Sequence, residues 1–304
     1  MIRPRFPRIR RWATAVALLL AGAAASVGCT SLDEWQRQAI FNPARDHARW
    51  FSEPLAGTVE YDVRLKNGDS LHFWYVPQAE AKRAPTVLYL HGARWNMNGS
   101  VFRISRWHDL GFNVLAVDYR GFGRSTDLLP SEDSAAEDTR VAFDELRRRQ
   151  PDPARRYLYG HSLGGALAIE LASELPQDEF AGLIVEATFT SIPDLVRGMR
   201  WGWIPGIGLV VTQRFDSSER IGRVTAPLLV LHGTEDSIVP HTMADQLYER
   251  AGSRTKRIVK IEGGSHSGAR GGNKSFREAV LAFVHSSASA AGAGAAASVG
   301  AAAD

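Results

Sequence analysis

Residues 156–170, RYLYGHSLGGALAIE, decide the fold of this chain. An apolar run precedes GHSLGG directly, and an alanine-rich apolar stretch follows it. GHSLGG fits the pattern Gly-x-Ser-x-Gly, which forms a sharp turn between a buried strand and a helix. In such a turn the serine is held in a strained backbone conformation with its hydroxyl exposed. The stretch predicts a strand, a helix and, between them, Ser162 as a nucleophile; a serine that only caps the helix is the alternative.

Similar apolar runs recur on both sides of this stretch. They suit strands that are buried on both faces of a parallel sheet. Their ranges are 86–90, 113–117, 182–186, 228–233 and 257–263. Helical patterns occupy 134–149, 163–175, 241–251 and 273–285, and the first of these begins with a capping box, Ser134 and Glu137. The alternation predicts a doubly wound, mostly parallel α/β sheet.

The remaining segments outline the domain. Alternating residues at 58–65 and 70–76 flank Asn67-Gly68-Asp69 and predict a β-hairpin. We expect one α/β domain over 58–285, preceded by a polar spacer at 30–57. Residues 190–224 interrupt the rhythm and form either a small cap insertion or an ordinary helix–loop connection. The Ala/Gly/Ser tail, 286–304, has too little apolar bulk to offset its ordering entropy, so we expect disorder there.

The basic excess of the chain belongs to its first residues. The net charge is +3, yet residues 1–28 hold five arginines and no acidic residue. The rest of the chain has 31 basic against 33 acidic residues. A nucleic-acid partner would require a basic patch on the folded domain, so we expect none.

The amino terminus has the pattern of an export signal. Arginines precede an uncharged, mostly apolar run at 12–28, which is short for a membrane span. Cys29, the only cysteine, follows directly and excludes an intrachain disulfide. The arrangement resembles a bacterial lipoprotein signal, which implies lipidation of Cys29 as first mature residue and attachment to the cell envelope. Ser26 departs from that pattern, and a secreted or periplasmic protein, an uncleaved anchor, or a twin-arginine signal at Arg10-Arg11 stays open.

A serine nucleophile needs a base, and the base needs an orienting acid. In this type of fold they follow in the order serine, acid, histidine. Asp236 comes just after the run at 228–233, and His266 lies in a glycine-rich loop after 257–263. Both positions are at carboxyl ends of strands, where ligands bind in open α/β sheets. We predict Asp236 as the acid and His266 as the base, with Glu235 and Glu186 as rival acids.

Backbone amides are expected to hold the oxyanion of a tetrahedral intermediate. One is Leu163, directly after the nucleophile. The other lies in HGARWN, 91–96, where Ala93 is the first choice and Arg94 the second. Asp118, in DYRGFGRS, is expected to shape its loop with Arg120 or Arg124.

The other histidines are assigned to structure. His91, His161 and His232 stand where a histidine more often braces a loop than transfers protons. No grouping of His, Cys, Asp and Glu has the spacing of metal ligands, so no metal is expected.

These motifs, in this order, resemble the α/β-hydrolase superfamily. With IFNP at 40–43, EATFTSI at 186–192 and FDS at 215–217, they are similar to its membrane-associated serine hydrolases with a small cap. The likeness covers roughly residues 38–285 and implies hydrolysis of an ester, thioester or amide without a cofactor. That branch carries asparagine after His-Gly, where this chain has Ala93, so the substrate preference is expected to differ.

Three classes of function follow from these residues. The first is an esterase or lipase that acts on a small acyl substrate through Ser162, Asp236 and His266. The second is a serine peptidase or acyltransferase with the same triad. The third is a non-catalytic envelope scaffold that kept the fold.

Overall fold

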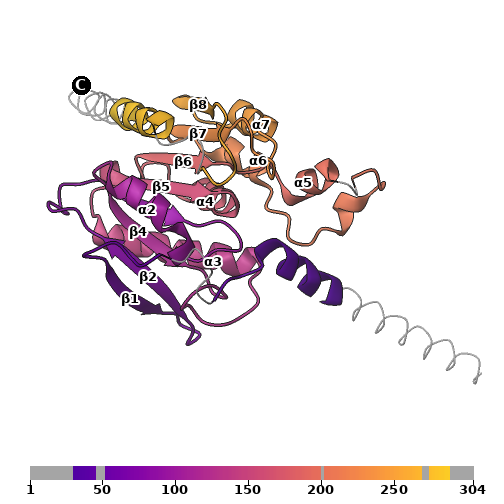
Figure 1. Ribbon diagram of the computed structural model, residues 1–304, viewed down its shortest axis with the longest axis horizontal. Coiled ribbons are helices and arrows are strands. Elements are labelled where there is room, and N and C mark those ends of the chain that lie inside the picture. Colours follow the sequence, from indigo (N-terminus) through magenta and orange to yellow (C-terminus); the bar gives the residue numbers. More distant parts are fainter. Residues whose placement is uncertain (1–29, 46–51, 200–201, 269–273, 288–304) are drawn as a thin grey trace, which may run out of the picture.

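A computed structural model describes residues 30–45, 52–199, 202–268 and 274–287. Its centre is one eight-stranded sheet in the order β1-β2-β4-β3-β5-β6-β7-β8, with helices on both faces (Figure 1). From β4 to β8 all neighbouring strands are parallel, whereas β2 pairs antiparallel with both β1 and β4. The predicted doubly wound, mostly parallel α/β sheet is confirmed.

The strands lie where the apolar runs predict them. Their bounds are β1 Val59–Arg64, β2 Ser70–Val76, β3 Thr86–Leu90, β4 Asn113–Asp118, β5 Arg156–His161, β6 Gly182–Glu186, β7 Leu228–Gly233 and β8 Lys256–Ile261. Every residue of β3 to β7 is buried, as a central parallel strand requires. β1 and β2 pair antiparallel, with Arg64 opposite Ser70 next to the turn and Val59 opposite Tyr75 at the far end. This pairing is the predicted β-hairpin.

The helices differ more from the sequence patterns. The longer ones among the described residues are a helix at 30–41, α2 Val101–His108, α3 Glu132–Arg149, α4 Leu163–Glu174, α5 Ile192–Gly198, α7 Thr242–Arg250 and a carboxyl-terminal helix at 274–287. α3 begins two residues before the predicted start. Its capping box is formed by Ser131 and Ser134, each accepting a hydrogen bond from the other's backbone amide, so Ser134 is not the first residue of the box. The predicted box of Ser134 and Glu137 was wrong, because a serine at the third helical position can accept the hydrogen bond that glutamate usually accepts.

Two apolar layers cover the sheet. One face packs against α3, α4 and α7, and its cluster contains the fully buried Phe41 and Phe215. The other face packs against α2 and the helix at 274–287, around Trp107 and Phe276. The sheet is therefore covered on both sides, and its carboxyl edge is left for loops.

Two segments project from one end of the molecule (Figure 1). Residues 30–41, within the expected spacer, are helical, and the buried Phe41 anchors the end of this helix in the core. Residues 190–224 hold α5, the short helix α6 Ser217–Arg220 and the 3-10 helices η3 Ile207–Val210 and η4 Ile221–Arg223. The expected signal at 1–28, Cys29 and most of the 286–304 tail lie outside the described residues.

Glycine lets the helix α4 approach the sheet. A Cβ atom at Gly164 would lie 2.1 Å from the Leu90 carbonyl oxygen. We expect Gly164→Ala to destabilise the protein by about 3 kcal/mol, because the backbone of a strand cannot move aside cheaply. The measurement is the free energy of unfolding in urea.

The matched control is Gly198→Ala, at the end of α5. No heavy atom lies within 4 Å of a Cβ at this position. The control should change stability by no more than about 1 kcal/mol. Equal losses in the two variants would show that the close approach of α4 to β3 is not what requires glycine.

Candidate active site

Ser162 stands between β5 and α4 in an unusual backbone conformation. Its φ is 54° and its ψ is −119°, a region that non-glycine residues rarely adopt. This strained conformation persists because hydrogen bonds fix both the amide and the carbonyl of Ser162. The Ser162 amide donates to the Glu186 carbonyl at 2.9 Å, and its own carbonyl accepts from the Thr188 hydroxyl at 2.8 Å. The predicted turn is present, with Ser162 at its tip.

The structure brings Ser162, Asp236 and His266 together. Nε2 of His266 lies 3.1 Å from Oγ of Ser162. Nδ1 of the same ring lies 2.8 Å from Oδ2 of Asp236. An imidazole that carries its proton on Nδ1 donates it to Asp236 and accepts the serine hydroxyl proton at Nε2. The arrangement is therefore able to move a proton from Ser162 to His266.

Asp236 is held as an ionised acceptor. Its Oδ1 accepts from the amides of Ile238 and Val239 at 2.9 and 2.8 Å, and Nε2 of His232 lies 3.1 Å from Oδ2. Burial alone would raise the pKa of Asp236, but hydrogen bonds from His232 and His266 outweigh it and hold that pKa well below its usual range. A charged carboxylate is what stabilises an imidazolium.

The rival acids are placed elsewhere. Glu235 is exposed, and its amide donates to the Gly264 carbonyl at 2.9 Å. Glu186 is buried and accepts from Nη2 of Arg106 at 2.5 Å and from the Tyr159 hydroxyl. Of the three carboxylates weighed from the sequence, Asp236 is the one in contact with His266.

The loop after β3 lies against the nucleophile. A Cβ atom at Gly92 would be 3.4 Å from Cβ of Ser162. Arg94, with a φ of 72°, donates its amide to the Phe41 carbonyl at 2.8 Å, so that amide is already engaged. Within the described ranges, the amides of Ala93 and Leu163 have no backbone hydrogen-bond partner. These two amides are therefore available to an oxyanion, and Arg94 is not.

Two buried side chains, Asp118 and His91, support this loop from its inner side. Oδ1 of Asp118 accepts from the Met97 amide at 2.8 Å and lies 3.5 Å from Nε2 of His91. Burial raises the pKa of Asp118 to about 7 and lowers that of His91 to about 4. The loop-shaping role expected of Asp118 is observed.

Of the two expected partners of Asp118, Arg124 donates a backbone hydrogen bond to its carboxylate, whereas Arg120 is engaged elsewhere. The Arg120 guanidinium pairs with Asp138 at 2.7 Å, with Asp69 at 3.0 Å and with Glu137. The side chain of the other candidate, Arg124, pairs with Glu60 at 3.0 Å.

Two residues fix the backbone that carries His266. Nη2 of the buried Arg103 donates to the Ser267 carbonyl at 2.6 Å and lies 3.0 Å from Nε2 of His161. That nitrogen in turn lies 2.9 Å from the His266 carbonyl oxygen. Burial, followed by the charge of Arg103, lowers the pKa of His161 well below its usual value, so the ring is neutral. His161 braces a loop as predicted, whereas Arg103 was not foreseen because no motif marks it.

The ion pair of Glu186 and Arg106 predicts a pH dependence of stability. Burial alone would raise the pKa of Glu186, but Arg106 and Arg103 hold it at about 2, below its ordinary 4.5. The stability that this lowered pKa contributes is therefore fully present above about pH 4.5 and is lost as the pH falls towards 2. We expect Glu186→Gln to lose about 3 kcal/mol at pH 7, because Arg106 remains buried without its counter-charge. Urea unfolding at pH 7, 5 and 3 measures both effects.

The control is Glu174→Gln, which breaks an exposed pair with Arg140. It should cost about 1 kcal/mol at most. If both variants lose the same stability at pH 7, or Glu186→Gln keeps the full acid dependence of the wild type, the assignment to Glu186 is wrong.

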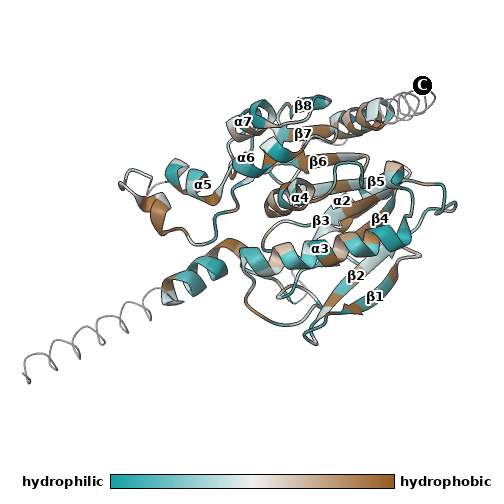
Figure 2. Ribbon diagram, turned by 180° about the vertical axis from the view of Figure 1, so that it is seen from behind, coloured by the Kyte–Doolittle hydropathy of each residue, from teal (hydrophilic) through white to brown (hydrophobic). Residues whose placement is uncertain are grey.

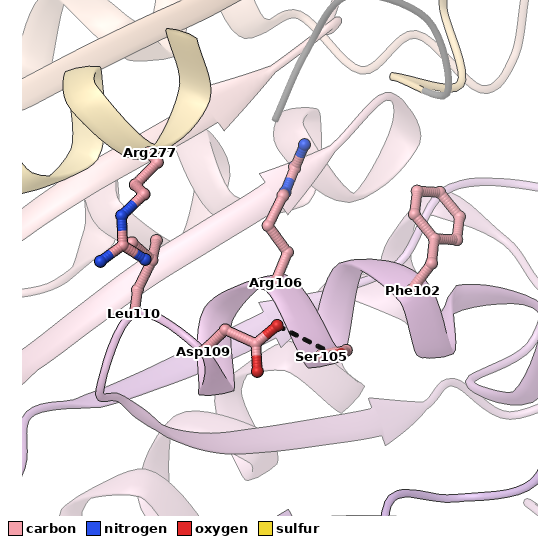
Figure 3. Close-up of a pocket in the computed structure, with 6 residues that line it drawn as sticks. All are labelled: Phe102, Ser105, Arg106, Asp109, Leu110 and Arg277. Atoms are coloured by element: carbon pink, nitrogen blue, oxygen red, sulfur yellow. Dashed lines mark hydrogen bonds between the residues drawn. The ribbon is translucent and has the colours of Figure 1, made fainter. Parts of the chain in front are cut away.

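A pocket between α2 and the carboxyl-terminal helix contains none of the triad residues (Figure 3). Its side chains are Phe102, Ser105, Arg106, Asp109, Leu110 and Arg277. Among the described residues, no three His, Cys, Asp or Glu side chains are grouped to hold a metal ion. None of the described helices is both long and apolar enough to cross a bilayer.

Known proteins resemble this chain over most of its length. The family described as "Serine aminopeptidase, S33" matches residues 81–214 and 208–269. The uncharacterized protein MT2364 of Mycobacterium tuberculosis is 32% identical over 83% of this chain and 86% of its own length. The uncharacterized protein YfhR of Escherichia coli K12 is 30% identical over 75% of this chain and 80% of its own length.

Solved structures share the fold. The esterase PF2001 of Pyrococcus furiosus superimposes with a TM-score of 0.63 at 18% identity, over 81% of this chain and 97% of that one. Together with the sheet order and the family match, this assigns the architecture and the coarse activity, that of a hydrolase. The chain belongs to the family described as serine aminopeptidase, S33, of the α/β-hydrolase superfamily.

Proposed function

We propose that this hydrolase cleaves acyl esters through Ser162, Asp236 and His266. The observation that carries the proposal is the unbroken chain of contacts from Oγ of Ser162 to Nε2 of His266, at 3.1 Å, and from Nδ1 to Asp236, at 2.8 Å. A nucleophile, a base and an orienting acid within hydrogen-bonding distance are what acyl transfer requires.

The proposed reaction has two halves. His266 takes the proton of Ser162 as Oγ attacks the carbonyl carbon, and the amides of Ala93 and Leu163 stabilise the resulting oxyanion. The protonated His266 then gives its proton to the leaving alcohol, which leaves an acyl-enzyme. His266 then takes a proton from water as the water oxygen attacks the acyl carbon. It passes this proton to Oγ of Ser162 as the bond between Oγ and the acyl carbon breaks, which releases the acid and restores the free enzyme. Every catalytic group in this cycle belongs to the chain, so the proposal requires no cofactor.

An aminopeptidase is the second candidate, and the description of the matching family favours it. Such an enzyme has to bind the ammonium of its substrate with a carboxylate. Glu186 is engaged by Arg106, and Asp118 is buried beneath the loop, so neither faces a substrate. Glu235 is exposed and directly precedes Asp236 in the chain, which makes it a candidate for binding that ammonium.

Substrate panels separate these candidates. The purified protein is tested with p-nitrophenyl esters of increasing acyl length and with aminoacyl p-nitroanilides, each beside Ser162→Ala. The ester proposal expects serine-dependent turnover of the esters that exceeds that of the anilides. Faster cleavage of the anilides would replace the esterase proposal with an aminopeptidase. Transfer of the acyl group to added alcohols would replace it with an acyltransferase. A folded protein without turnover on either panel would favour the scaffold.

We propose further that the protein is attached to the bacterial envelope through a lipid on Cys29. Support comes from the sequence alone: five arginines, an apolar run at 12–28 and the cysteine directly after it. Growth with an alkyne-bearing fatty acid should label the wild type and not Cys29→Ser. Equal labelling of the two would reject lipidation at Cys29.

A further inference from the structure

Exposed apolar side chains gather in two segments. Among the described residues, most of the exposed large hydrophobic side chains lie in the helix at 30–41 and in the stretch around η3. We call these six residues the apolar patch: Leu32, Trp35, Met199, Trp203, Leu209 and Val210. Leu209 is 87% exposed and Trp203 is 75% exposed, so these side chains project into the surroundings instead of filling a core. Grouped exposure of this kind marks an interaction surface.

Hydrogen bonds join the two segments. Nε2 of Gln36 donates to the Val210 carbonyl at 2.8 Å, and Oε1 of the same side chain accepts from the Thr212 amide at 2.9 Å. Nε2 of Gln213 donates to Asp33 at 2.8 Å. The helix at 30–41 therefore lies alongside η3, and both are at the same end of the molecule (Figure 1). Hydropathy colouring shows a strongly apolar stretch within the projecting segment there (Figure 2).

The sequence before the helix indicates what covers this surface. Thr30, the first described residue of this helix, directly follows Cys29 and the uncharged run at 12–28 in the sequence. A helix rises about 1.5 Å per residue, so Trp35 lies only about 8 Å along the axis from Thr30. A chain attached to a bilayer at Cys29 or through the run before it keeps Trp35 within reach of the interfacial layer. Tryptophan is the side chain that favours this layer.

We propose that the apolar patch rests on a lipid bilayer, with Trp203, Leu209 and Val210 inserted into its interfacial layer. The segment 190–224 begins after the carboxyl end of β6 and returns through η4 to β7. Ser162 follows the carboxyl end of β5, the neighbour of β6. A bilayer on the patch would therefore adjoin the sheet edge that carries Ser162. A second copy of the chain or a soluble protein could also cover an apolar surface. The bilayer is favoured because the patch begins three residues after Cys29.

A fluorescent probe on the full-length chain tests this. In a Cys29→Ala background, Leu209→Cys is labelled with an environment-sensitive dye, and Asp178→Cys carries the same dye as the control. Asp178 is exposed in the loop before β6, at the opposite edge of the sheet. Each protein is mixed with vesicles of phosphatidylcholine containing a minor fraction of phosphatidylglycerol. The readouts are the emission maximum and quenching by nitroxide-labelled lipids.

The proposal expects a blue shift and nitroxide quenching at 209, with no change at 178. Adding Trp35→Ser, Trp203→Ser and Val210→Ser to the protein labelled at 209 should abolish both signals. A chain that is tethered only by residues 12–28 would leave the probe at 209 in water, which would overturn the proposal. A blue shift at 209 that grows with protein concentration without vesicles would overturn it as well, in favour of a second copy. These readouts do not depend on turnover, so they stand apart from the proposed reaction.

Discussion

Replacing Ser162 by alanine is expected to lower kcat for the best ester substrate by about a million-fold, the usual cost of removing the nucleophile of such a triad. The reason is that no other hydroxyl is in contact with Nε2 of His266 among the described residues. Binding and the Ala93 and Leu163 amides remain, so a small rate above the uncatalysed reaction should survive. Steady-state kinetics with a p-nitrophenyl ester measures the loss.

Ser173→Ala is the matched control, because Ser173 lies near the other end of α4 and its hydroxyl donates to the Glu170 carbonyl. It should leave kcat close to the wild-type value. Circular dichroism and the urea midpoint establish that both variants are folded. A folded Ser162→Ala protein that turns over at the wild-type rate would contradict the proposed nucleophile.

Replacing Asp236 by asparagine is expected to lower kcat by about 10⁴-fold. Asparagine can present its amide N–H₂ to Nδ1 of His266, which favours the tautomer that cannot accept the serine proton at Nε2. It also removes the negative charge that stabilises the imidazolium. The amide oxygen can still accept from Ile238 and Val239, so we expect the turn after β7 to persist.

The neighbouring Glu235→Gln serves as the comparison for this variant. Glu235 makes a backbone contact to Gly264, and its exposed carboxylate does not contact His266. We expect ester turnover near wild type in Glu235→Gln. A larger loss in Glu235→Gln than in Asp236→Asn would reassign the orienting acid.

Strands and helices differ in how far local sequence determines them. β3, β6 and β7 begin and end at the residues that their apolar runs predict, because a strand buried on both faces must be apolar throughout. α2 has no comparable signal. Its Arg103 and Arg106 point into the protein, where Ser267 and Glu186 accept their hydrogen bonds. These partners are far away in the chain, so local sequence does not reveal them. From local sequence alone, the arginines of α2 look like those of an exposed basic segment.

The helix at 30–41 was missed for a similar reason. Only Phe41 and Gln36 are buried in it, and Gln36 is held by contacts to Val210 and Thr212. A helix that docks through one glutamine and one aromatic ring has no apolar periodicity to reveal it. Strand order likewise depends on long-range pairing, which no local pattern contains.

In the candidate site, local motifs identify positions but not partners. The turn at GHSLGG identifies Ser162 because its glycines and its flanking strand and helix are all local. The choice between Glu235 and Asp236 depends on which side chain the turn after β7 directs towards His266, a matter of one residue. Arg103 touches Ser267, 164 residues away, and only the folded chain reveals it.

The most direct test of the central claim is covalent labelling with a fluorophosphonate, followed by mass mapping of the modified peptide. The probe reacts with a serine that a neighbouring base activates. We expect one modification on Ser162 in the wild type, and strongly reduced labelling when His266 is replaced by alanine in a folded protein. No labelling of the folded wild type, or labelling of a different serine, would contradict it.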